Sequence, residues 1–213
     1  MTLEMAERVS PGGSVVGLDM DAVKLDLARK AAADRSITNV EFRTARVQFW
    51  NELRSYDAAY SRFLLQHLSN PTSLIRRMWG SLRRGGVLMI EDVDHDTWAC
   101  YPRNEGFEFY RRALAAVIDN HGGDHAIGRK LFSCCLKAGV PRPSVQAVTP
   151  LYMEGEGRFL PVSTLDSITD SVVVSGIATR KEVGRARASL RRFLQNPRAL
   201  VMGPTNFQLS AKR

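Results

Sequence analysis

The sequence predicts an α/β fold, doubly wound, in which helices cover both faces of a mostly parallel sheet. Short apolar runs typical of buried strands alternate with longer runs typical of helices. The connections are short, which favours strand–helix–strand units. At 213 residues and 44% apolar content, the chain can bury a core, so disordered and collagen-like classes are excluded.

The first half of the chain follows this alternation in order. Residues 2–9 predict the last turns of a helix, which Pro11 and the glycines after it stop. The apolar run 14–18 predicts a buried strand that ends at Asp19, and the alanine-rich residues 22–33 predict a helix. The same patterns predict strands at 40–43, 56–60 and 87–90 and a helix at 71–82.

The pattern becomes more helical and aromatic after residue 93. Helices are expected at 105–119 and 129–138, with a pair of helices in 163–195, a strand at 145–148, and one last strand formed by 200–202 and 206–209. No linker rich in Pro, Gly or Ser separates a second domain. We therefore expect one domain, residues 1–213, with insertions 94–130 and 151–195 as a lid at the carboxyl edge of the sheet.

Composition limits the compartment and the partners. The amino terminus has acids early and lacks the apolar segment of a signal peptide, and no apolar run approaches the roughly 18–20 residues of a membrane span. Three cysteines, two of them adjacent, fit neither a disulfide framework nor a zinc site. These features predict a cytoplasmic protein with reduced thiols, no bound metal and no membrane partner.

The charge is positive and uneven. The net charge is 30 − 22 = +8, and residues 176–213 hold nine bases against one acid. A basic helix can bind nucleic acid, which leaves a nucleic-acid-binding module as an alternative function. No aromatic residues interleave with these bases, and this argues against a nucleic-acid partner.

Strand ends are where such sheets bind ligands, because the carboxyl ends of parallel strands border a crevice. Asp19 is the most informative residue there, since a carboxylate can accept hydrogen bonds from both hydroxyls of a ribose. The alternative is that Asp19 only precedes a helix cap, a role that Asp21 can also fill.

The ordered motifs resemble those of a known family. The segments GSVVGLDMD, NVEF, YDAAYSRFLLQHLSNP, LRRGGVLMIED and a late FQL are similar to class I S-adenosylmethionine-dependent methyltransferases, most clearly over residues 13–93. The turn LRRGG resembles the family's usual L-K-P-G-G. The resemblance implies a Rossmann-like fold, S-adenosylmethionine as cofactor, and methyl transfer to a small-molecule acceptor.

The resemblance also implies roles for the strand-end residues. Asp19 would hold the ribose of the cofactor, and Met20 would pack on its adenine. The residues implied to flank the adenine are Ala45, Arg46 and Val47, and those implied to lie near the methionine moiety are Ser61, Arg62 and Phe63.

Two residues are catalytic candidates. His67 can act as a general base for a hydroxyl acceptor, with packing at a helix start as the alternative. Asp92 opens an acidic stretch, 92–96, whose oxygens would suit a magnesium ion, with a polar loop after a strand as the alternative. Methyl transfer itself needs mainly alignment and desolvation.

Two features depart from the family pattern. No GxGxG loop follows the first strand, so by the resemblance the chain begins inside the next helix and lacks the central strand. Arg46 stands where the family often has an acid that contacts the adenine amino group. A truncated or non-catalytic remnant is therefore an alternative. A nicotinamide-dependent oxidoreductase is another, although no Tyr-x-x-x-Lys occurs. Two open strand edges predict self-association, for example as a homodimer.

The aromatic residues of the first insertion allow two interpretations. They can line an apolar lid over the acceptor or pack as an ordinary core. The residues are Trp98, Tyr101, Phe107 and Tyr110.

Overall fold

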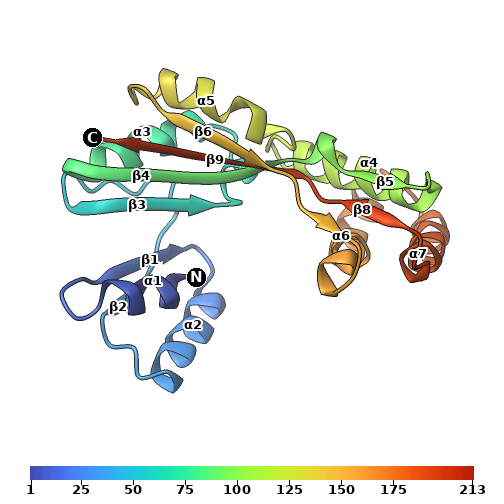
Figure 1. The fold of residues 1–213 in the computed structure, drawn as a ribbon, viewed down its shortest axis with the longest axis horizontal. Coiled ribbons are helices and arrows are strands. Elements are labelled where there is room, and N and C mark those ends of the chain that lie inside the picture. The colour runs from blue at the N-terminus through green and yellow to red at the C-terminus, as the bar shows by residue number, and fades with distance from the viewer. The chain divides into compact units, whose positions relative to one another are not determined.

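The computed structural model describes residues 1–213 and divides into two compact units. The first unit is Met1–Glu52 and the second is Leu53–Arg213. Figure 1 shows the order of helices and strands within each. The expectation of one domain stays a prediction.

The first unit is a pair of parallel strands with two helices. Its elements are α1 (Thr2–Val9), β1 (Val15–Asp19), α2 (Ala22–Asp34) and β2 (Val40–Thr44). The strands pair in parallel from Val15 beside Val40 to Asp19 beside Thr44, so their carboxyl ends are adjacent. Asp21 caps α2 by accepting hydrogen bonds from two backbone N–H groups of its first turn.

The second unit contains a four-stranded mixed sheet. Its strands are β3 (Tyr56–Arg62), β4 (Leu82–Asp94), β6 (Ser144–Val148) and β9 (Thr205–Lys212), in the order β3-β4-β9-β6. β3 and β4 are parallel, whereas β9 runs antiparallel between β4 and β6 (Figure 1). This sheet brings the carboxyl ends of β3 and β4 to the same edge.

Helices α3 (Pro71–Ser81) and α5 (Ile127–Lys137) pack on this sheet and on each other, so they share one face (Figure 1). The strand residues directed toward them are buried: Leu88 and Ile90 of β4, beside Ala211 and Leu209 of β9. The alternate β4 residues, such as Met89, stay half-exposed.

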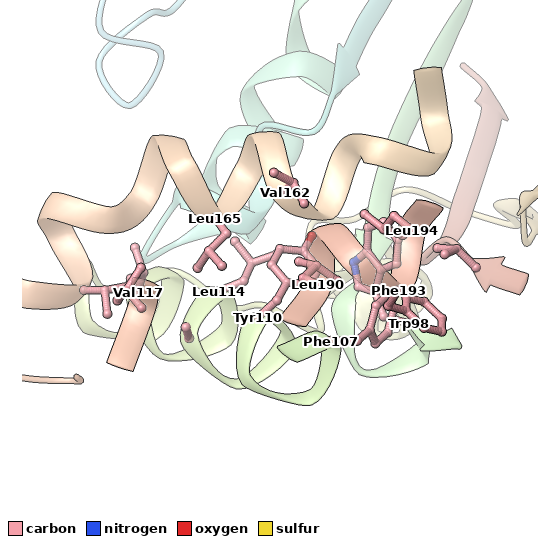
Figure 2. Close-up of a cluster of buried hydrophobic side chains, with 14 of the residues drawn as sticks. Trp98, Phe107, Tyr110, Leu114, Val117, Val162, Leu165, Leu190, Phe193 and Leu194 are labelled. Atoms are coloured by element: carbon pink, nitrogen blue, oxygen red, sulfur yellow. The ribbon is translucent and has the colours of Figure 1, made fainter. Parts of the chain in front are cut away.

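The second unit also has a cap, which we define as helices α4 (Glu105–Asn120), α6 (Leu160–Val174) and α7 (Arg180–Gln195) with a three-stranded sheet of β5 (Ala99–Tyr101), β8 (Leu200–Met202) and β7 (Leu151–Tyr152). Figure 2 shows side chains of the three helices meeting in one apolar cluster. Short helices η1 (Leu65–His67), η2 (His95–Thr97) and η3 (Glu156–Phe159) complete the unit.

Of the two interpretations for the aromatic residues of the first insertion, the structure supports packing as an ordinary core for three of the four. Trp98, Phe107 and Tyr110 are at most 5% exposed, and the Trp98 ring meets the other two edge-on at centroid distances of 6.1 and 5.6 Å. They form the core of the cap. Tyr101 is 72% exposed and lies outside that core.

The last strand differs from its prediction. Residues 200–202 belong to β8 in the cap, and residues 205–212 form β9 in the main sheet. Gly203 and Pro204 separate the two, and proline lacks the N–H that a continuous ladder needs. The two short strands β5 and β7 carry too few residues to show a period in the sequence.

Several strand edges have no partner strand, and two of them belong to strands β1 and β3. β1 pairs only with β2, and β3 pairs only with β4. An open edge presents unpaired N–H and C=O groups to other chains, and lysine on an edge strand opposes such pairing.

We expect the apparent molar mass of this chain to rise with its concentration, because these open edges can pair between molecules. Replacing the exposed Ala58 of β3 by lysine should reduce that association. Ala188→Lys, which adds the same charge on the exposed face of α7, should not. Static light scattering across a concentration series checks this, and a wild-type chain that is monomeric throughout would contradict it.

Candidate functional site

The carboxyl end of β1 carries the carboxylate of Asp19. Its Oδ1 accepts a hydrogen bond from the backbone N–H of Asp21 at 2.9 Å, while Asp21 itself caps α2. The other oxygen of Asp19 has no partner. Asp19 is therefore not the cap residue, and it keeps one acceptor free for a ligand.

A hollow of about 370 Å³ lies at this end of β1. It is lined by Met20, Arg46, Gln48 and Phe49. Met20 is 67% exposed and Phe49 75% exposed, so two apolar side chains border the hollow and face solvent. Met20 and Arg46, predicted from separate segments, thus come together, whereas the sequence analysis missed Gln48 and Phe49.

The loop after β2 is tied to this strand end by the backbone. The N–H of Ala45 donates to the carbonyl of Asp19 at 2.8 Å, and those of Phe49 and Trp50 donate to the carbonyl of Arg46. These bonds close a tight turn that contains Val47.

The carboxyl end of β3 bends sharply. Phe63 has a φ of +52°, in the left-handed region that costs a bulky residue energy. Its N–H donates to the carbonyl of Glu91, and the Arg62 guanidinium lies 4.6 Å from the centre of the Phe63 ring. Ser61 is buried beside Ile90, on the face covered by helices. Of the three predicted residues here, Arg62 and Phe63 are exposed.

Asp92, at the end of β4, is fully buried. Its Oδ2 accepts hydrogen bonds from the N–H groups of Leu65 and Gln66, and its Oδ1 accepts one from Val93. Burial raises the pKa of Asp92 to about 6, against the opposite effect of these N–H donors. Both oxygens are thus engaged in holding the turn that follows β3.

His67, the other catalytic candidate, ends that turn and is exposed. Partial burial, followed by the charge of His121, lowers its pKa. The ring is therefore neutral at pH 7 and can accept a proton. Its role as a base stays a prediction.

A hydrogen-bonded relay joins this turn to the cap. The indole N–H of Trp98 donates to Nδ1 of His95 at 3.1 Å, so Nε2 of His95 carries the proton and donates to Oε1 of Gln66 at 2.8 Å. Burial lowers the pKa of His95 to about 4, which keeps the ring neutral. The relay fixes Gln66 and, through it, the turn.

The rest of the acidic stretch is engaged with cations. Arg129 binds Asp94 through two nitrogens and also pairs with Asp96 at 3.2 Å. His125 lies between Asp119 and Asp96, whose charges raise its pKa against burial. The acids of this stretch therefore have protein partners.

The basic helix α7 is partly neutralised by α6. Asp166 pairs with Arg187 and Arg191, and Asp170 pairs with Arg180. The cations of α7 that have no ion pair are Lys181, Arg185 and Arg192. Its charge thus serves in part to join two helices of the cap.

The parallel strand pairs, with polar residues at their carboxyl ends, define an α/β fold of the Rossmann-like type. Residues 1–134 match a family model described as a methyltransferase domain, and the chain belongs to this family of S-adenosylmethionine-dependent enzymes. The predicted fold class and cofactor are confirmed.

Individual relatives agree with this family. Over 97 residues the chain is 37% identical to a trans-aconitate 2-methyltransferase of Deinococcus radiodurans. The aligned region covers 45% of this chain and 34% of that protein. This chain spans less than half the length of the curated relatives that it matches.

Solved structures share the fold. A putative methyltransferase from Bacillus halodurans C-125 matches at 12% identity and a TM-score of 0.61, covering 99% of this chain and 97% of that one. A coclaurine N-methyltransferase, solved with N-methylheliamine and SAH, matches at 14% identity and a TM-score of 0.56, covering 100% of this chain and 64% of that one.

All helices of this chain are too short or too polar to be transmembrane spans.

Proposed function

We propose that this chain transfers a methyl group from S-adenosylmethionine to a small-molecule acceptor, and that the hollow at the end of β1 binds the adenosine part of the cofactor. The observation that carries the proposal is the meeting of Met20 and Arg46 at one hollow. Asp19 directly precedes Met20 in the sequence. The family membership supports the methyl-transfer reaction, and the hollow supports the end of β1 as the position where adenosine binds.

The residues of the hollow fit an adenosine. The free oxygen of Asp19 can accept a hydrogen bond from a ribose hydroxyl. Met20 and Phe49 offer apolar surfaces that can flank a flat purine. Gln48 can both accept and donate at the purine edge, whereas Arg46 has only donors. Gln48 is therefore the better partner for the adenine amino group.

Fewer residues can be assigned to the methionine moiety of the cofactor than to its adenosine. Within residues 1–213, no glycine-rich loop follows a parallel strand and opens a helix. The roles of Ser61, Arg62 and Phe63 near the methionine moiety stay predictions. Failure to bind S-adenosylmethionine would favour the alternative of a non-catalytic remnant.

Methyl transfer requires few chemical steps from the protein's own side chains. The bound cofactor supplies an electrophilic methyl group on a sulfonium. His67, neutral at pH 7, can take the proton of an acceptor hydroxyl or amine. Asp92 is fully buried and engaged by three N–H groups, so it acts by holding the turn that carries His67.

Asp19→Ala should weaken S-adenosylmethionine binding about 10- to 100-fold, because hydrogen bonds to a charged group are worth roughly 1.5–3 kcal/mol. Phe49→Ala should weaken it about 3- to 10-fold through lost stacking. Isothermal titration calorimetry with S-adenosylmethionine measures both. The matched controls are Asp57→Ala and Phe132→Ala, an exposed carboxylate and an exposed phenylalanine of the other unit. Equal affinities for all five proteins, wild type included, would contradict the proposed site.

A further inference from the structure

The cap's small sheet has an unusual outer face. Cross-strand neighbours point to the same side of a sheet. Ala99 pairs with Met202, which also pairs with Leu151, and Tyr101 pairs with Leu200. These five side chains therefore share one face, and none of them is charged.

The opposite face of this sheet is apolar as well. Val201 is fully buried in the cap core, and its neighbours Cys100 and Tyr152 pack against that core. An antiparallel sheet with one face on a core usually presents polar side chains on the other. The outer face departs from this rule, so packing inside the cap does not explain it.

The outer face is exposed at its two edges, on β5 and β7, whereas Ala99, Leu200 and Met202 are half-buried. Tyr101 is 72% exposed, Leu151 55% and the adjacent Met153 68%. Sites for small molecules are usually concave, whereas this is the face of a short sheet. An apolar face with exposed side chains on both edge strands is typical of an interaction with a larger surface.

Two unpaired cations lie close in sequence to the strands of this face. Arg103 follows Tyr101 by two residues and Arg198 precedes Leu200 by two; both are exposed and neither has an ion-pair partner. Glu154 is an exposed acid that also lies close in sequence to these strands. The chain carries a net charge of +8, which at this face favours an anionic surface over a second copy of the chain.

We propose that the outer face of the sheet β5-β8-β7, with Arg103 and Arg198, is a peripheral docking surface for an anionic lipid bilayer. A bilayer can take up a few apolar side chains with a tyrosine and arginines at the headgroup level. A stable dimer buries about 800 Å² per partner, more than five or six side chains provide. This proposal departs from the sequence-based prediction of no membrane partner, which rested on the lack of an apolar run long enough to span a bilayer, and it does not depend on methyl transfer.

Vesicle co-sedimentation tests the apolar part. The chain should pellet with vesicles of phosphatidylcholine containing about 30% phosphatidylglycerol, and more weakly with pure phosphatidylcholine. Met153→Glu should lower the partition coefficient at least tenfold, because a charge would replace an apolar side chain that the bilayer takes up. Val174→Glu makes the same charge change at an 85% exposed valine ending α6, and should have less than a twofold effect. Because both substituted residues are exposed, both variants should keep the wild-type melting temperature.

A second arm tests the charge. Arg198→Gln should weaken binding to the anionic vesicles about fivefold and leave the neutral vesicles unaffected. Lys30→Gln, at an exposed lysine of α2, is the control. Equal pelleting of Met153→Glu and Val174→Glu would overturn the proposal. So would a chain that pellets with neither vesicle, or a dimer that Met153→Glu dissociates, which would assign the face to a second copy.

Discussion

Replacing Asp92 with alanine should destabilise the protein by about 3 kcal/mol. Three backbone N–H groups, those of Leu65, Gln66 and Val93, would lose their acceptor in a buried position. Each unsatisfied buried donor costs about 1–3 kcal/mol, partly relieved by local rearrangement. At about 2–4 °C per kcal/mol for a chain of this size, the melting temperature should fall by roughly 6–12 °C. Calorimetry or circular dichroism measures it.

The pH dependence of this residue has a defined sign. Burial raises the pKa of Asp92 from 3.8 to about 6 in the folded protein. Between these values the folded state binds a proton that the unfolded chain has released, so stability falls as pH rises through this window. The stability that comes from this retained proton is fully present below about pH 4 and is lost above about pH 6. A pKa shift of this size corresponds to about 3 kcal/mol.

Asp92→Asn isolates this effect, because asparagine keeps the volume and does not titrate. The stability of the wild type minus that of Asp92→Asn should decline from pH 4 to pH 6.5. Asp57→Asn, at a carboxylate 80% exposed, should show no comparable decline. A pH-independent difference for Asp92→Asn would show that the carboxylate is solvated in the folded protein.

Phe107→Ala should destabilise the cap by about 3–5 kcal/mol, the usual cost of removing a fully buried phenylalanine. Phe107 is fully buried, with its ring 6.0 to 6.4 Å from the rings of Trp98, Tyr110 and Phe193. Tyr101→Ala, at a residue of the same insertion that is 72% exposed, should change stability by less than about 0.5 kcal/mol.

Thermal unfolding of the two variants tests the core role that the structure gives to Phe107. A core role for Phe107 requires the large loss in that variant alone. Similar small losses in both would mean that Phe107 lies at a surface, as the lining of an acceptor pocket would.

Most elements were predictable because their patterns are local. Residues 2–9, 22–33 and 105–119 were predicted as helices and lie within α1, α2 and α4, since spacing and capping act within one turn. The strands at 40–43 and 145–148 were found for a similar reason, since apolar residues alternate with polar ones over a few consecutive positions. The split of the last strand was not predictable, because each half pairs with strands that are distant in the sequence.

The candidate site was predictable in part. Asp19 and Met20 end an apolar run, and this position alone indicates a ligand site in a parallel sheet. Gln48 and Phe49 were missed, because nothing in a loop sequence says which side chains border a hollow. The role of Asp92 was missed as well, since two of its three N–H partners, Leu65 and Gln66, lie in η1, more than twenty residues away.

The sequence by itself determined the α/β class, the order of the elements and the family, because hydrophobic period and strand-end motifs are properties of consecutive residues. Only the tertiary structure decided which aromatic residues form the cap core, which oxygen of Asp19 is free and why Asp92 is buried. It also revealed an apolar outer face on the sheet β5-β8-β7. Burial and hydrogen bonding depend on residues brought together across long stretches of chain, and no local pattern records that pairing.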